Sequence, residues 1–351
     1  MKPLLLLAAT ATAEQPGISA AGATPQSRRL TATADAELLM LGPAAQRPHA
    51  LPPLPAGVSP ALIAHVGLRE LGLLHRTQVV DLGCPVAPAV PHWRLPAGEA
   101  AGPAACVSTG RAMAPQRVAA LLERGRRWGQ CWPEGEPLLL AECVPGGTTT
   151  ALGVLQGLGL AAVGLVSGSL REPAHGLKAR LVSEGLAAAG LGVAGADPLA
   201  VLAAVGDPMQ AVAAGLLLEL APRGIPVLLA GGSQMAAVLA LALDLAAPEQ
   251  REALAQGAVV ATTAWVAEES GSDLQRLLRL IGERWQVQPQ LAVAALRFHH
   301  CRSPALRDYE RGYVKEGVGA GGVAVLWELA GRDPLALAAA CDPACEQLLR
   351  L

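Results

Sequence analysis

Short apolar runs alternate with longer amphipathic stretches along the last two thirds of the chain. Five runs have the length of strands and are continuously apolar: residues 138–141, 161–166, 225–230, 258–262 and 291–296. The longer stretches between them have helical character: residues 177–188, 209–220, 234–245 and 273–284. Continuous apolar strands separated by helices are typical of a parallel sheet covered on both faces. The pattern therefore predicts an α/β fold with a Rossmann-like parallel sheet flanked by helices.

The first 135 residues lack this alternation. One helix is predicted at residues 114–128, but frequent prolines keep other elements short and favour an extended segment that wraps around the rest. We therefore expect residues 136–330 to form the α/β core. Residues 1–135 would contribute to a smaller domain and could add one strand to the sheet, and residues 331–351 would add a C-terminal helical tail.

The N-terminus has two interpretations. Lys2 and the apolar residues 4–9 have the order of charge and apolar residues found in a secretory signal peptide. The apolar stretch is shorter than usual, however, and a signal peptide normally has more than one positive charge before it. The same residues fit a short buried strand equally well. We expect a cytoplasmic protein.

Composition narrows the class of protein. Of the 351 residues, 52% are apolar and 16% are charged, which excludes wholesale disorder. The 27 basic and 29 acidic residues leave a net charge of −2, so the chain lacks the basic surface that a nucleic-acid binder needs. No apolar run reaches the roughly 18 residues of a membrane span. The seven cysteines are scattered without a C-x-x-C pair, so we expect a reducing compartment and no metal site.

A glycine- and threonine-rich junction directly follows the predicted strand at residues 138–141. Glu142 ends the strand, and Gly146, Gly147, Thr148 and Thr149 precede or open a helix. Glycines let a ligand approach the backbone, and a helix start offers free N–H groups to an anion. The junction is a candidate phosphate cradle, with a threonine-rich helix cap as the alternative. It lacks the Gly-Lys-Ser/Thr of a triphosphate loop and a strand-end aspartate for magnesium, so we expect neither a metal nor a cofactor.

Two further junctions combine glycine with a polar helix start. Gly231, Gly232 and Ser233 follow the predicted strand at residues 225–230, which makes them candidate ligand contacts. Gly206 and Asp207 precede a proline that opens another helix. Asp207 fits a helix cap and a ligand contact equally well.

The last glycine-rich segment, residues 315–322, contains Glu316, Gly317 and Gly319. It matches the spacing G-x-G-x-x-G, but the preceding residues are charged, so no buried strand leads into a dinucleotide-binding turn. Glu316 is the more informative residue. A carboxylate packed in a crowded glycine segment loses water, and its raised pKa suits it to accept a proton.

In this order, the junctions resemble segments of the nicotinate-nucleotide:dimethylbenzimidazole phosphoribosyltransferases of cobalamin assembly. The similarity spans roughly residues 136–330 and lies in four segments: residues 142–149, 197–207, 223–231 and 315–320. The whole chain is similar to a branch of that family found in archaea and cyanobacteria. The resemblance implies transfer of ribose 5-phosphate from nicotinate mononucleotide to an aromatic base, such as dimethylbenzimidazole or adenine, in cobamide lower-ligand assembly. It also implies a homodimer.

The resemblance further implies the roles of individual residues. Glu316 would be the general base, and Glu142 a second carboxylate near the ribose or the incoming base. The 5′-phosphate would lie on Gly146, Gly147 and Thr148. Lys178 would be its counter-charge, although an exposed surface lysine is equally compatible with the helical sequence around it.

The chain also departs from the family pattern. The N-terminal Lys-Pro-x-Gly-Ser-Leu-Gly motif is absent, Gly147 replaces asparagine, Lys315 replaces glycine and Val318 replaces threonine. These changes keep two alternatives open. One is a non-catalytic nucleotide-binding or sensor protein that retains the fold, and the other is an unrelated sugar-phosphate enzyme.

Overall fold

Seven parallel strands form one sheet in the computed structural model, which describes residues 1–96, 102–192 and 195–350. They lie in the order β3-β2-β1-β4-β5-β6-β7, and each neighbouring pair is parallel. The strands are β1 (Lys2–Leu7), β2 (Gln78–Asp81), β3 (Trp93–Arg94), β4 (Leu138–Cys143), β5 (Val227–Ala230), β6 (Ala258–Thr263) and β7 (Gln290–Ala294). The predicted parallel sheet is confirmed.

The strand order reverses next to β1. The chain runs outward from β1 through β2 to β3, returns to β4 on the other side of β1, and continues to β7. Ligands of open α/β sheets bind beyond the carboxyl ends of the strands near such a reversal. The carboxyl ends of β1 and β4 are therefore the expected place for a site.

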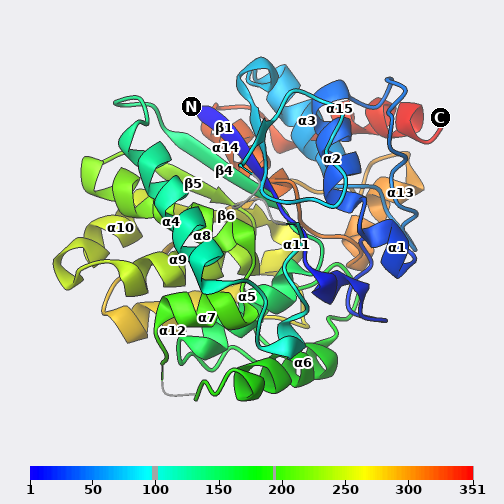
Figure 1. The fold of residues 1–351 in the computed structure, drawn as a ribbon. Helices are drawn as coiled ribbons and strands as arrows, with labels where there is room; N and C mark the ends of the chain where they lie inside the picture. Colours follow the sequence, from blue (N-terminus) through cyan, green and yellow to red (C-terminus); the bar gives the residue numbers. More distant parts are fainter. Residues whose placement is uncertain (97–101, 193–194, 351) are drawn as a thin grey trace.

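One face of the sheet is covered by helices from the middle of the chain, which lie to the left of and below the sheet in Figure 1. Leu4 and Leu6 of β1 face this layer. Its helices are α4 (Pro115–Gln130), α5 (Gly147–Gly157), α6 (His175–Ala188), α7 (Pro198–Val205), α8 (Pro208–Leu220), α9 (Ser233–Leu245), α10 (Arg251–Gly257) and α12 (Leu274–Trp285).

The other face is covered by helices from the two ends of the chain, and Leu5 and Leu7 of β1 face them. These are α2 (Thr31–Leu41), α3 (Ala61–Glu70), α11 (Ala264–Ala267), α13 (Pro304–Arg307), α14 (Ala320–Leu329) and α15 (Pro334–Leu348). In the chain α1 (Pro25–Arg28) precedes them, and short 3-10 helices occupy Ala11–Glu14, Leu74–Arg76, Val107–Thr109, Ala221–Arg223, Pro248–Gln250 and Tyr309–Arg311. Because α3 packs against α2, α14 and α15, segments from both ends of the chain form one smaller layer.

Most of the predicted elements are present, with ends shifted by a few residues. One predicted strand, at residues 161–166, is wrong. Ala162, Leu165 and Val166 are buried, but Gly164 has a left-handed φ of 79° and Leu165 N–H donates to the carbonyl of Ala162, so the chain turns there. An apolar run can fill a core without pairing in a sheet.

The first 135 residues contribute more to the sheet than expected, because they supply β1, β2 and β3. Residues 4–7 lie inside β1, between β2 and β4, where their side chains are at most 3% exposed. The strand interpretation of this segment is therefore the one that the structure adopts. Within the described ranges, no helix combines the length and the apolar character needed to cross a bilayer.

Candidate active site

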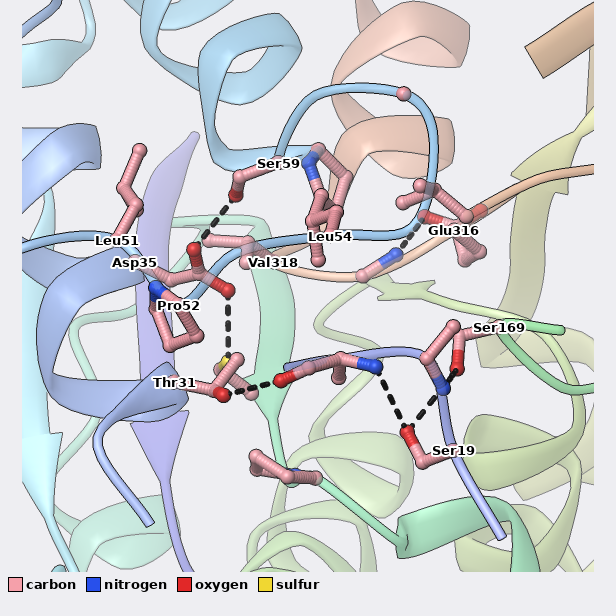
Figure 2. A pocket seen from close by; sticks show the side chains of 18 of the residues that line it. Ser19, Thr31, Asp35, Leu51, Pro52, Leu54, Ser59, Ser169, Glu316 and Val318 are labelled. Carbon is pink, nitrogen blue, oxygen red and sulfur yellow. Dashed lines mark hydrogen bonds between the residues drawn. The ribbon is translucent and has the colours of Figure 1, made fainter. Parts of the chain in front are cut away.

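A cavity of about 830 Å³ opens beyond the carboxyl ends of β4, β5 and β6 (Figure 2). This volume lies in the range typical of small-molecule sites. One part, here called the polar half, is formed by residues 142–148, 167–169, 232–234 and 316–317. The opposite part, here called the apolar half, includes residues of the segments 45–60 and 348–349 together with Val318.

Two helix starts face the polar half. Gly146 precedes α5 with a left-handed φ of 81°, and Gly232 precedes α9; neither helix start has a side-chain cap among the described residues. A β-carbon at position 147 would overlap the side-chain amide of Gln234, so a larger residue there would displace the amide that donates to Glu142. The N–H groups of Gly147, Thr149 and Met235 already donate to backbone carbonyls. The remaining first-turn N–H groups and the positive ends of the two helix dipoles make this half suitable for an anion.

Glu142 lies at the end of β4 and is 2% exposed. Its Oε1 accepts a 2.8 Å hydrogen bond from Gln234 Nε2, and its Oε2 accepts a 2.9 Å bond from the N–H of Val144. Burial, with the nearby charges of Asp207 and Glu316, raises the pKa of Glu142 to about 8. Glu142 is therefore mostly protonated at pH 7 until a cationic ligand binds beside it, because such a ligand would favour the ionised form.

Glu316 is held by four donors. Its Oε1 accepts hydrogen bonds from the N–H groups of Gly317 (3.1 Å) and Gly321 (2.9 Å). Its Oε2 accepts from the Thr262 hydroxyl and the Thr263 N–H, both at 3.0 Å. Burial raises the pKa of Glu316, and these hydrogen bonds oppose the rise because they favour the charged form. The result is a desolvated carboxylate with a fixed orientation.

The segment before Glu316 is anchored away from the cavity. Lys315 is 1% exposed, has a left-handed φ of 66°, and does not line the cavity. Its Nζ donates to the carbonyl of Leu170 at 2.7 Å and pairs with Glu269 at 2.5 Å. The lysine that replaces the family's glycine therefore leaves the access to Glu316 free and fixes the loop instead.

Lys178 is buried, which corrects the alternative of an exposed surface lysine. Its Nζ donates to the carbonyl of Ser167 at 2.5 Å, directly behind the loop that lines the polar half. Burial and the nearby Lys315 lower the pKa of Lys178 to about 7, while Glu269 opposes this shift. Lys178 supports the wall of the cavity from outside the lining.

The structure brings eight of the predicted site residues to the lining of one cavity: Glu142, Gly146, Gly147, Thr148, Gly232, Ser233, Glu316 and Gly317. Six others are not part of the lining: Thr149, Lys178, Gly206, Asp207, Gly231 and Gly319. Asp207 caps α8, accepting from the N–H groups of Met209 and Gln210, and it also accepts a 2.5 Å hydrogen bond from Thr150. Of the two roles considered for Asp207, the structure shows the helix cap.

Several lining residues carry no local sequence signal. Asp35 and Arg47 come from the proline-rich first third, and Ser167 and Ser169 follow directly after the run that was predicted to be a strand. Gln234, next to the predicted Ser233, was recognisable only as a polar residue at a helix start. Arg47 is half-buried, and its Nε makes no hydrogen bond among the described residues. It offers the apolar half a positive charge.

No three His, Cys, Asp or Glu side chains gather as a metal site within residues 1–96, 102–192 and 195–350. The cavity instead combines anion-binding helix starts, the buried Glu142, the half-buried Glu316 and an apolar wall. This set of groups can hold a phosphorylated sugar, stabilise positive charge and accept a proton.

A family model described as a phosphoribosyltransferase (DBI_PRT) matches residues 73–265. Similar curated proteins include a UPF0284 protein of Parasynechococcus marenigrum (strain WH8102), 53% identical over 351 aligned positions that cover 99% of this chain and 87% of the relative. A UPF0284 protein of Gloeobacter violaceus is 47% identical over 339 positions, covering 96% of this chain and 85% of that protein.

Two solved structures from Thermus thermophilus share the fold. The first is described as CobT; it has a TM-score of 0.60 and 22% identity, over 97% of this chain and 82% of that one. The second is described as a nicotinate-nucleotide-dimethylbenzimidazole phosphoribosyltransferase; its TM-score is 0.57 and its identity 19%, over 97% and 81% of the two chains. At these identities the likeness concerns the fold.

Proposed function

The chain belongs to the phosphoribosyltransferase family whose model it matches, and from that premise we propose that it transfers ribose 5-phosphate from nicotinate mononucleotide to a nitrogen of an aromatic base. The observation that carries the proposal is the cavity itself. Glu142, Glu316 and the starts of α5 and α9 all line it. A phosphoribosyl donor needs this combination of anion-binding and carboxylate groups.

The polar half would hold the donor. Its 5′-phosphate would accept hydrogen bonds from the first-turn N–H groups of α5 and α9 and from the hydroxyls of Thr148 and Ser233, which line the same wall. Nicotinate in this donor is attached through a cationic pyridinium nitrogen, so it can leave without being protonated. No general acid is then required.

Glu142 would stabilise the reacting sugar. As nicotinate leaves, positive charge develops on the ribose, and a nearby carboxylate lowers the energy of that state. Glu142, protonated before the donor binds, would lose its proton when the cationic donor arrives, because an adjacent positive charge favours the carboxylate.

Glu316 would accept the N–H proton of the incoming base. Both oxygens of Glu316 already accept two hydrogen bonds each, so the N–H group of the base must replace one of the four donors. The Thr262 hydroxyl can rotate away, whereas the three backbone N–H groups cannot. Holding the two planar reactants against one another would supply much of the remaining acceleration.

The acceptor would be dimethylbenzimidazole, adenine or a similar base, in keeping with a role in cobamide lower-ligand assembly. We further propose a cytoplasmic homodimer and a division into residues 1–135, 136–330 and 331–351. These points follow from the resemblance to the family and from the sequence pattern.

The direct test mixes the protein with nicotinate mononucleotide and a panel of bases and measures free nicotinate and the new base ribotide. We expect both products in equal amounts and only when a base is present. Tight binding of the mononucleotide without either product would favour the alternative, a non-catalytic nucleotide-binding or sensor protein. Nicotinate release without a base would indicate a hydrolase instead.

A further inference from the structure

We propose that Asp35 selects the acceptor base. The base that this transferase uses carries a hydrogen-bond donor, an amino or hydroxyl group, on the ring edge opposite the nitrogen that receives the ribose, and the Asp35 carboxylate accepts that hydrogen bond. This inference rests on the proposed function. It adds the chemical class of the second substrate and the residue that recognises this substrate.

Asp35 is a buried carboxylate on the side of the cavity that also carries Leu51 and Pro52. It comes from α2, lines the cavity, and is 5% exposed. Its Oδ1 accepts a 2.6 Å hydrogen bond from the Ser59 hydroxyl, and its Oδ2 accepts a weak 3.6 Å contact from the Cys143 thiol. A carboxylate has about four acceptor positions, so two bonds leave room for a donor from a ligand.

Asp35 is still ionised at neutral pH. Burial raises its pKa to about 6, while the bonds from Ser59 and Cys143 limit the rise. A buried charged oxygen is unfavourable unless its hydrogen bonds are completed, and a ligand in the cavity can complete those of Asp35. The position therefore favours ligands that donate and disfavours purely apolar ligands.

The surroundings place a ring between Asp35 and Glu316. Leu54 and Val318 lie between the two carboxylates in Figure 2, and Leu51 and Pro52 continue the apolar wall on the Asp35 side. A planar base held between these side chains would direct one edge to Glu316 and the opposite edge to Asp35. The N–H group on the edge at Glu316 would lose its proton to Glu316, and the amino or hydroxyl group on the opposite edge would donate to Asp35.

The apolar wall also distinguishes the base from the donor sugar as the partner of Asp35. Ribose hydroxyls need several polar groups, and these lie in the polar half with Glu142 and the two helix starts. Asp35 instead projects from the side that carries Leu51, Pro52 and Leu54.

The test uses matched bases that differ by one donor: benzimidazole against 5-hydroxybenzimidazole, and purine against adenine. For the unmodified protein we expect kcat/KM to be about 10- to 100-fold higher for the donor-bearing member of each pair, the range for a hydrogen bond to a charged group. Asp35→Asn should reduce this preference to about 3-fold or less, because the amide replaces one acceptor oxygen with a donor. Asp244→Asn is the matched control, since Asp244 pairs with Trp285 outside the cavity.

Binding of the four bases to the unmodified protein and to Asp35→Asn, measured by calorimetry, provides a second readout that does not depend on turnover. Equal use and equal binding of both members of each pair would overturn the inference while leaving the proposed function intact. A raised KM for nicotinate mononucleotide with unchanged base preference would assign Asp35 to the ribose and also overturn it. If no base is ribosylated, the proposed function fails. The role of Asp35 would still be supported if the unmodified protein binds the donor-bearing bases selectively and Asp35→Asn loses that selectivity.

Discussion

The two halves of the cavity are built in different ways. The polar half consists largely of the end of β4 and the starts of α5 and α9, so the backbone of Glu142 and the helix N–H groups are fixed by the hydrogen bonds of the sheet and the helices. The apolar half comes largely from the irregular segment 45–60. That segment is held at a few points, including hydrogen bonds from Tyr309 to the carbonyl of Val58 at 2.8 Å and from the Gly57 N–H to Asp308 at 2.8 Å.

From this difference we infer that the two halves have different functions, catalysis in the polar half and base selection in the apolar half. A reaction that needs charges at fixed positions benefits from the rigid polar half, where a small displacement is costly. Selection among flat apolar bases needs shape and one or two polar contacts, which an irregular segment can supply. Changes in the polar half should therefore affect the rate of transfer, and changes in the apolar half the choice of base.

The largest effect is expected for Glu316→Gln. Loss of the proton acceptor should lower kcat by about 10²- to 10⁴-fold, the usual contribution of general base catalysis. Each oxygen of Glu316 accepts two hydrogen bonds. In either orientation of the glutamine, its NH2 group would face two of these donors and lose both bonds, so a lower melting temperature is also expected.

Because the variant is expected to be less stable, mononucleotide binding and kcat are measured at a temperature at which Glu316→Gln is still folded. Glu328→Gln serves as the control, because Glu328 accepts from the N–H of Ala295 outside the cavity. Turnover by Glu316→Gln at the rate of the unmodified protein would rule out the role of Glu316.

Gly321→Ala should disturb the same carboxylate through packing. The added methyl group would overlap Glu316 Oε2 and the backbone of Thr262, so we expect a loss of about 1–3 kcal/mol in the free energy of unfolding, together with slower transfer. Gly176→Ala, in an open position of α6, should instead gain about 0.5–1 kcal/mol. Chemical denaturation compares the two variants, and equal stability of both would contradict this packing.

Glu142→Gln should change how stability depends on pH. The folded protein keeps the Glu142 proton up to a pKa of about 8, whereas the unfolded chain loses it near 4.5. Proton binding therefore stabilises the folded state fully below pH 4.5, and this contribution is lost as the pH rises to 8. Between pH 5 and pH 8 the free energy of unfolding should fall by about 3.5 kcal/mol less in the variant than in the unmodified protein. Parallel pH profiles from urea denaturation would contradict the raised pKa.

The smallest effect is expected in the apolar half. Leu54→Ala removes part of the apolar wall and should raise KM for the base about 10-fold, with kcat and the KM for the mononucleotide nearly unchanged. Leu335→Ala, at an exposed position of α15 outside the cavity, should leave all three parameters unchanged. A large fall in kcat for Leu54→Ala would remove the distinction between the two halves.

Sequence patterns predicted the polar half better than the apolar half. Gly146 and Gly147 lie in a local motif, because a strand end followed by glycine and a helix start has one dominant geometry. Glu316 was recognisable from the glycine-rich segment around it. Asp35 lacks such a motif: its partner Cys143 is 108 residues away, and only the folded chain brings them together. The strand predicted at residues 161–166 is wrong for a related reason, since a turn that buries only Ala162, Leu165 and Val166 has the same apolar sequence as a strand buried in a sheet.

The measurement that tests this division most directly is a crystal structure of the protein with nicotinate mononucleotide and adenine bound. We predict the phosphate within hydrogen-bond distance of the first-turn N–H groups of α5 and α9, and the base between Leu54 and Val318 with its reacting nitrogen beside Glu316. A phosphate bound in the apolar half, or a base stacked away from Glu316, would contradict the account.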